Sequence, residues 1–142
     1  MLFRSIATGQ LSRSKVVETE SEFPTFNPSK AQQRNQYTYT ACSVPNEADS
    51  FFNGIAKVDE NGEAQSLTLD QGYYGSEPVF APRQGAKDED DGYVLEVVYN
   101  GYKHVSELLI MNAKQLSDCQ AKLTLRHHVP HQFHGLFVEQ TF

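Results

Sequence analysis

Short runs of alternating residues, each bounded by turn residues, recur along the chain and constrain its fold more than any other feature. The clearest signal is GIAKVDENGEAQSLTL (54–69), where Asn61-Gly62 separates two such runs. Asn-Gly supplies the positive φ angles that a tight hairpin turn needs. Further runs with a strand pattern are QYTYTACSV (36–44), EPVFAP (77–82), GYVLEVVYN (92–100), SELLIMNA (106–113), CQAKLTLRHHV (119–129) and HGLFVEQTF (134–142). About eight short strands with regular turns are typical of sandwiches, barrels and propellers.

Little of the chain is expected to be anything but strand and turn. EFPTFNPSK (22–30) contains two prolines and reads as a loop. KQLSDC (114–119) is the one candidate for a helical turn, and no long amphipathic pattern occurs. The chain is therefore predicted to be all-β, with two successive units of antiparallel four-stranded sheet at about residues 36–83 and 92–140.

The composition excludes several classes of function. The chain has 142 residues, enough for one domain, and a net charge of -6 with no basic patch, so nucleic acid is not an expected partner. Cys42 and Cys119 lie far apart and are expected to be unpaired thiols. KDEDD (87–91) is more simply a solvated turn than a cation site. No apolar run reaches the length of a membrane span and no signal peptide is recognised, which favours a cytoplasmic protein.

Histidines gather near the end of the sequence, in HHVPHQFHG (127–135). A helix would bring His127, His131 and His134 to one face at a zinc-like spacing. Pro130 opposes a helix, and an extended chain would instead scatter these side chains to both faces. A metal site made by this peptide alone, using also His128, is therefore a weak alternative.

His134 differs from its neighbours because it stands between Phe133 and the apolar run 135–138, where it is expected to point into a buried space. A histidine ligand usually donates its second ring N–H to a carboxylate, which fixes the tautomer. Glu22 in SEFPTFN and Glu77 in GSEPVF stand in apolar surroundings and are candidate partners. Each is also consistent with a surface residue at the end of a strand.

Four of these segments together resemble a known family. They are SEFPTFNP (21–28), GSEPVFAPRQGAKDEDDGYVLEVVY (75–99), LLIMNAKQL (108–116) and PHQFHGLF (130–137). In order and spacing they are similar to the C-terminal part of the carotenoid cleavage oxygenases, which include apocarotenoid, lignostilbene and epoxycarotenoid dioxygenases and a retinoid isomerase. The resemblance covers the chain from about residue 17 onward.

The resemblance implies a seven-bladed β-propeller with Fe(II) on its axis, held by four histidines, three of which are oriented by glutamates. Matched by motif, His134 is an iron ligand and Glu77 is the acid that orients it. Glu22 matches a second such acid, whose histidine lies upstream in the family. His127, His128 and His131 match no ligand position, and their role stays open.

The activity implied is cleavage of a C=C bond of a carotenoid, apocarotenoid or stilbene by O2, giving two carbonyl products. Contact with membranes that store such apolar substrates is also implied. Family members are much longer than this chain, and their other three iron ligands lie upstream; His104 matches none of them. The chain alone is therefore expected to be an inactive C-terminal piece that needs the missing blades in cis or from another chain. The alternative is a non-catalytic β-module that binds a partner through open sheet edges.

Overall fold

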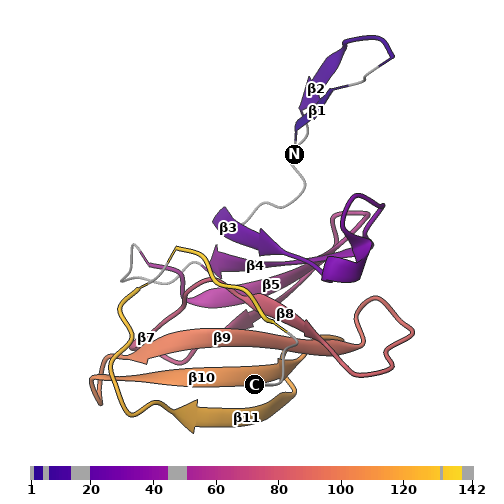
Figure 1. Ribbon diagram of the computed structural model, residues 1–142. Coiled ribbons are helices and arrows are strands. Elements are labelled where there is room, and N and C mark those ends of the chain that lie inside the picture. The colour runs from indigo at the N-terminus through magenta and orange to yellow at the C-terminus, as the bar shows by residue number, and fades with distance from the viewer. Residues whose placement is uncertain (1, 5–6, 14–19, 45–50, 132, 139–142) are drawn as a thin grey trace.

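The computed structural model describes residues 2–4, 7–13, 20–44, 51–131 and 133–138, and they are almost entirely β-strand and turn (Figure 1). The strands are β1 (Leu2–Arg4), β2 (Leu11–Arg13), β3 (Glu20–Thr25), β4 (Tyr37–Ser43), β5 (Gly54–Asp59), β6 (Ala64–Thr68), β7 (Tyr73–Tyr74), β8 (Val79–Pro82), β9 (Gly92–Asn100), β10 (Val105–Asn112) and β11 (Cys119–Thr124). One short 3-10 helix, η1 (Pro28–Lys30), follows β3. All strand pairs are antiparallel, which confirms the all-β expectation.

The first large sheet has the strand order β3-β4-β5-β6, while β1 and β2 form a separate two-stranded sheet. Strands β5 and β6 form the hairpin predicted from Asn61-Gly62, although only Gly62 has a positive φ, of 87°. The Asp59 carboxylate closes the turn, because its Oδ1 accepts the backbone N–H groups of Asn61 and Glu63 at 2.9 and 2.8 Å. Local turn chemistry therefore sets this hairpin, as the sequence indicated.

Strand β3 lies where a loop was expected, so the interpretation of 22–30 as a loop was wrong for its first residues. β3 is an edge strand that pairs only with β4, and the register shifts between Glu22 and Thr25. Pro24 is tolerated there because an edge strand leaves one side of its backbone unpaired. The irregularity includes Phe23, which has a φ of 56°. Such bulges bend a strand and re-aim its side chains.

The second large sheet has the order β11-β10-β9-β7, and β8 also pairs with β9. β9 lies where GYVLEVVYN predicted a strand, and buried and half-buried residues alternate along its whole length. Strand β7 pairs with the end of β9 at Tyr99 and Asn100, and β8 pairs with its beginning, from Gly92 to Leu95. Residues 75–78 lie between β7 and β8, opposite the stretch of β9 that neither strand reaches. The proposed unit limits, 36–83 and 92–140, stay a prediction.

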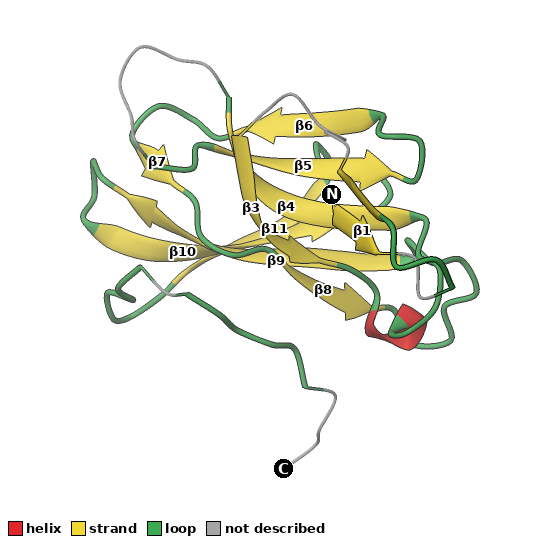
Figure 2. Ribbon diagram, turned by 90° about the horizontal axis from the view of Figure 1, so that it is seen from above, coloured by secondary structure: helices red, strands yellow, loops and turns green. Residues whose placement is uncertain are grey.

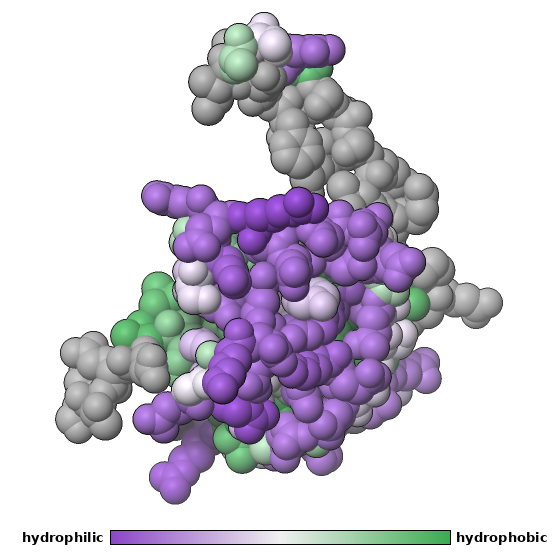
Figure 3. Space-filling model, turned by 90° about the vertical axis from the view of Figure 1, so that its right-hand side faces the viewer, coloured by the Kyte–Doolittle hydropathy of each residue, from purple (hydrophilic) through white to green (hydrophobic). Residues whose placement is uncertain are grey.

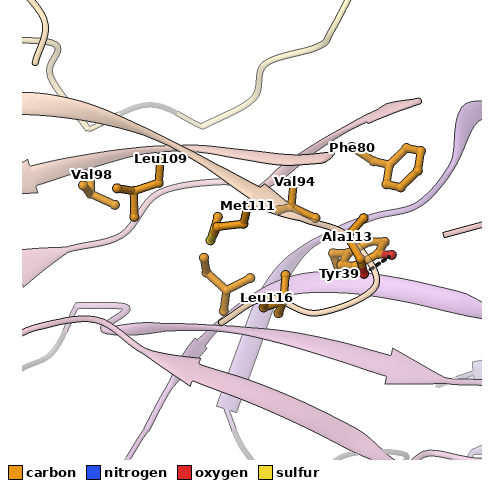
Figure 4. Close-up of a cluster of buried hydrophobic side chains, with 9 residues drawn as sticks. Tyr39, Phe80, Val94, Val98, Leu109, Met111, Ala113 and Leu116 are labelled. Atoms are coloured by element: carbon orange, nitrogen blue, oxygen red, sulfur yellow. Dashed lines mark hydrogen bonds between the residues drawn. The ribbon is translucent and has the colours of Figure 1, made fainter. Parts of the chain in front are cut away.

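The core lies between the two large sheets (Figure 4). Its buried side chains are Tyr39, Ile55, Phe80, Val94, Val98, Leu109, Met111, Ala113 and Leu116. Tyr39 stacks on Phe80 with ring centroids 5.6 Å apart, and its hydroxyl donates to the Ala113 carbonyl at 2.9 Å. Burial raises the pKa of this phenol, so it stays a neutral donor. A buried phenol with a satisfied hydroxyl ties β4 to the chain after β10.

The acidic segment 87–91 is a turn, but its carboxylates are engaged with the protein. The salt bridges are Asp88–Lys114 at 2.6 Å, Asp90–Lys57 at 2.7 Å and Asp91–Arg83 at 2.9 Å. Glu89 accepts the backbone N–H groups of Gln36 and Tyr37. This end of the molecule is mostly hydrophilic (Figure 3). The segment therefore joins the second sheet to the first.

Two further expectations in the C-terminal half need correction. Residues 114–118 form turns and no helix, with Gln115 N bonded to the Asn112 carbonyl and Asp118 N to the Gln115 carbonyl, and Cys119 already begins β11. Residues 134–138 of the expected last strand form none, since no described strand pairs with them; residues 139–142 lie outside the described part. The segment after β11 instead runs along the second sheet, on the side away from the first sheet (Figure 2).

Both cysteines are free thiols, Cys42 buried and Cys119 exposed, as expected. Among the described residues, no helix has the length and apolar character needed to cross a membrane.

Candidate functional site

Glu77 and His134 are brought together although 57 residues separate them in sequence. The Nδ1 of His134 lies 3.0 Å from Oε1 of Glu77, and the Gly135 backbone N–H donates to Oε2 of the same carboxylate. The Glu77 side chain is only 14% exposed, whereas that of His134 is 75% exposed. The expectation that His134 points into a buried space is therefore wrong for this chain, since the described residues cover only part of the ring.

The loop that carries Glu77 is fixed on the uncovered edge of β9. Ser76 Oγ donates to the Val97 carbonyl at 2.6 Å, which occupies an acceptor that β7 and β8 leave unpaired. Pro78 is buried, and β8 begins at the next residue. Because the backbone is held on both sides of Glu77, its carboxylate is directed toward the C-terminal segment.

Phe23 brings the irregular part of β3 to the same histidine. Its ring meets that of His134 edge-on, with centroids 5.9 Å apart and planes at 80°. It also makes edge contacts with Phe52 at 5.7 Å and with Phe133 at 6.3 Å. Edge-to-face aromatic packing restrains ring orientation. His134 is thus held by a hydrogen bond at one ring nitrogen and by an aromatic neighbour.

A pocket of about 190 Å³ opens beside these residues, between β9 and the C-terminal segment. It is lined mainly by apolar side chains, among them Val79, Leu95, Val97, Leu136 and Phe137, and by Glu77 and His134. Apolar walls with a few convergent polar groups are typical of sites for small organic molecules.

Glu22, the other candidate acid, is not brought to a histidine within the described part of the chain. Its side chain is exposed, and its backbone carbonyl accepts a hydrogen bond from Thr40 Oγ1. Its neighbour Phe23 nevertheless contacts His134, so the Glu22 motif lies next to the Glu77–His134 pair.

Three of the other histidines, His104, His128 and His131, lie around the ring of Tyr99, with centroids 6.3, 5.2 and 6.3 Å away. His131 stacks on Phe51 with centroids 5.3 Å apart. His128 meets the ring of Tyr99 edge-on at 5.2 Å, and His104 Nδ1 lies 2.8 Å from the Tyr99 hydroxyl. His127 is exposed. Over the described residues, no group of three or more histidine, cysteine, aspartate or glutamate side chains is placed to hold a metal, so the peptide 127–134 forms no local zinc-like site there.

Sequence reasoning did not identify the buried acids of the second sheet, among them Glu96 of β9. Its side chain is 1% exposed and its Oε1 accepts the Ser76 backbone N–H at 3.1 Å. Burial raises the pKa of Glu96 to about 8, and the hydrogen bond from Ser76 opposes this shift. The signal was present, because alternation along GYVLEVVYN puts Glu96 on the same face as Val94 and Val98.

The pair suits one position in a metal centre. An imidazole whose Nδ1–H is held by a carboxylate presents its Nε2 lone pair in a fixed direction, and the carboxylate raises its basicity. Neutral imidazole suits iron, copper, nickel and zinc. His134 could therefore supply one ligand, with Glu77 as its orienting acid. Within the described residues it belongs to no group of three or more histidine, cysteine, aspartate or glutamate side chains placed to hold a metal.

Comparison with known proteins gives a consistent result. The family model described as "Retinal pigment epithelial membrane protein" matches residues 4–139. The apocarotenoid-15,15'-oxygenase of Synechocystis sp. is 30% identical over 135 residues, which are 94% of this chain and 28% of that protein. The chloroplastic 9-cis-epoxycarotenoid dioxygenase NCED6 of Arabidopsis thaliana is 34% identical over 132 residues, which are 91% of this chain and 22% of that protein. The chain thus spans less than a third of these relatives.

Solved structures of members of the same family superpose on this chain. A chimera of the Synechocystis oxygenase and RPE65 superposes with a TM-score of 0.90 at 29% identity, covering 98% of this chain and 30% of the chimera. The cobalt-substituted Synechocystis oxygenase gives a TM-score of 0.87 at 29% identity, covering 94% of this chain and 28% of that chain. The chain therefore belongs to the retinal pigment epithelial membrane protein family, the carotenoid cleavage oxygenases, and folds as about two blades of their seven-bladed propeller.

Proposed function

We propose that these residues belong to an iron(II)-dependent dioxygenase that cleaves one C=C bond of a carotenoid, apocarotenoid or stilbene. Both atoms of O2 enter the products, so that one alkene and one O2 give two carbonyl compounds. The observation that carries the proposal is the Glu77–His134 hydrogen bond of 3.0 Å. The names of the relatives, which are carotenoid and apocarotenoid oxygenases, support the substrate class.

In this proposal, His134 holds Fe(II) through Nε2 while its Nδ1–H stays on Glu77. Bound Fe(II), with neutral imidazole ligands and open positions, supplies a site at which O2 can react with an alkene. Glu77 fixes the ring in one tautomer and direction. Phe23 packs against the ring edge-on, which restricts its rotation. Glu22 orients a histidine that is expected from a blade outside this sequence.

The substrate meets an apolar surface in this proposal. Val79, Leu95 and Phe137 line the pocket beside His134, and such walls exclude water and suit a polyene or a stilbene. Contact with a membrane surface belongs to the same proposal, because polyenes partition into lipid.

We propose further that the 142 residues alone do not sustain the reaction. One histidine cannot hold iron tightly, and the other three ligands are expected from blades outside this sequence, in cis or from another chain. The other candidate function, a non-catalytic β-module, is favoured by a separate observation. In the described part of the chain, the outer strands β6 and β11 each pair on one side only, and such edges can pair with another chain.

The test uses the longer protein that contains these residues. His134→Ala should abolish iron binding and alkene cleavage, measured by metal analysis and by mass spectrometry of the carbonyl products formed under oxygen-18. Glu77→Gln should weaken iron binding or activity by roughly 10–100-fold. His131→Ala is the matched control, because His131 stacks on Phe51 and does not contact Glu77.

Full iron content in His134→Ala would refute the ligand assignment. An unchanged rate in Glu77→Gln would remove Glu77 as the orienting acid. A dead His131→Ala protein would mean that the wrong histidine was chosen. If the assembled protein bound no iron and instead formed a stable complex through β6 or β11, the β-module would be the better description.

A further inference from the structure

Glu96 is a buried acid for which the proposed reaction has no use. Its side chain is 1% exposed and lies on the face of β9 that is packed toward the first sheet. Its Oε1 accepts the Ser76 N–H at 3.1 Å, while its Oε2 has no hydrogen-bond partner among the described residues. Burying a carboxyl group with one oxygen unsatisfied is unfavourable, so its presence in a core strand calls for a local explanation.

The explanation lies in the edge of β9. Strand β7 pairs with Tyr99 and Asn100 of β9, and β8 pairs with residues 92–95 of β9. Between β7 and β8 the chain leaves the hydrogen-bond ladder along β9. The Ser76 N–H therefore has no backbone acceptor on β9. The Ser76 N–H is partly buried, and the Glu96 carboxyl supplies the acceptor that the ladder does not.

The fit around this contact is close. A Cβ added to Gly75 would lie 2.6 Å from Glu96 Oε1, so the carboxyl group fills the space that a side chain at residue 75 would need. Gly75 N also donates to the Phe52 carbonyl at 2.8 Å. The turn before Glu77 is therefore held from the core side as well as from the β9 edge.

We infer that Glu96 is a positioning residue, which holds the Gly75–Ser76 turn so that Glu77 reaches His134 and the Gly135 amide. The chain of contacts runs from Glu96 to the Ser76 N–H, and from the adjoining Glu77 to His134 Nδ1. Burial raises the pKa of Glu96 to about 8, so the carboxyl is neutral at neutral pH and acts through its hydrogen bond. The consequence for iron rests on the proposed function, whereas the hold on Glu77 does not.

Glu96→Leu and Glu96→Gln separate the hydrogen bond from the ionisation. Leucine fills the space but accepts no hydrogen bond, whereas glutamine keeps a carbonyl acceptor for the Ser76 N–H. Glu107→Leu is the matched control, because Glu107 is equally buried at 1% on the neighbouring strand but contacts Asn100 and the lysines 103 and 122. A general loosening of the core would affect both leucine variants alike.

The readout is nuclear magnetic resonance of this chain without metal. Amide hydrogen exchange at Ser76 and Gly135 reports the two ends of the contact chain, and the side-chain ¹⁵N shifts of His134 report its tautomer. Exposed His127 is the internal reference. In Glu96→Leu, we expect exchange at Ser76 and Gly135 to speed up by about tenfold or more and His134 to lose its Nδ1–H preference.

Glu96→Gln and Glu107→Leu should leave these signals as in the unchanged protein. The inference is overturned if Glu96→Leu leaves the Gly135 exchange and the His134 tautomer unchanged. It is also overturned if Glu107→Leu produces the same changes as Glu96→Leu, or if Glu96→Gln does not keep the signals of the unchanged protein. None of these signals needs iron, so a failure of the proposed function would leave this result standing.

Discussion

Replacing Glu96 by glutamine should change how the stability of the chain depends on pH. Burial raises the pKa of Glu96 from 4.5 to about 8 in the folded state. Below pH 4.5 the acid is protonated whether the chain is folded or unfolded, so it does not make the stability depend on pH. Between these values only the folded state holds the proton, and the stability therefore falls as the pH rises. Above pH 8 both states are ionised and the loss is complete.

The size of the effect follows from the same shift. Each pH unit in this interval costs the folded state about 1.4 kcal/mol. The loss reaches about 3 kcal/mol at pH 7 and about 5 kcal/mol in full, against total stabilities of roughly 5–15 kcal/mol for a domain. Glutamine does not titrate, so its free energy of unfolding should lack this slope. Any penalty for burying the glutamine amide is independent of pH and shifts the plot of unfolding free energy against pH by a constant amount.

The assay is urea-induced unfolding of both proteins from pH 4.5 to 8.5, repeated at high salt. The difference in free energy of unfolding should grow with pH in favour of Glu96→Gln. It should survive high salt, because burial rather than an exposed charge pair causes it. Parallel curves for the two proteins across this range would refute the reasoning and mean that Glu96 is ionised in the folded chain.

Two other predictions test separate parts of the structure. Glu89→Ala should lower the free energy of unfolding by about 1–3 kcal/mol, since the backbone N–H groups of Gln36 and Tyr37 lose their acceptor at the start of β4. Asp91→Ala, which breaks a half-exposed ion pair, should have a smaller effect in the same urea titration, and equal losses would contradict the role given to Glu89. A thiol reagent at pH 8 should modify exposed Cys119 quickly and Cys42 only on unfolding, because burial, and secondarily the charge of Glu96, raises the pKa of Cys42 to about 11. Mass spectrometry of the labelled peptides would show this order, and equal labelling would mean that Cys42 is accessible.

The strands that sequence reasoning found are those set by local patterns. The hairpin 54–68 follows from its turn residues, and β9 follows from a run of aromatic and branched apolar residues from Tyr93 to Tyr99 that is interrupted only by Glu96. In both, neighbouring residues carry enough information to fix the backbone. The all-β class could be predicted for the same reason.

The elements that were missed depend on distant partners. Pro24 argued against a strand, yet β3 forms because β4 offers an edge to pair with. Residues 134–138 have strand-like composition, but no described strand pairs with them. Strand formation is a property of two segments, and one segment alone predicts it poorly.

The candidate site also contains features that local sequence can predict and features that depend on distant residues. The Glu77–His134 contact joins residues 57 positions apart, and local chemistry left Glu77 as one of two acids; only the family resemblance selected it. The edge contact of Phe23 depends on a positive φ that nothing in the sequence signalled. Glu96, in contrast, could have been identified from its place in the alternation of β9.

The two hydrogen bonds that the Glu77 carboxylate accepts also limit which residue can replace it. Its two oxygens each take an N–H, from His134 Nδ1 and from the Gly135 backbone. Aspartate has the same two acceptors but is one methylene shorter, so it cannot reach both donors from the same backbone. Glutamine has the reach, but with its carbonyl on the Gly135 N–H its amide N–H would face Nδ1, so His134 would have to carry its proton on Nε2 and lose the free lone pair there. The position therefore has no conservative substitute, and its two closest chemical relatives fail for opposite reasons, one of length and one of polarity.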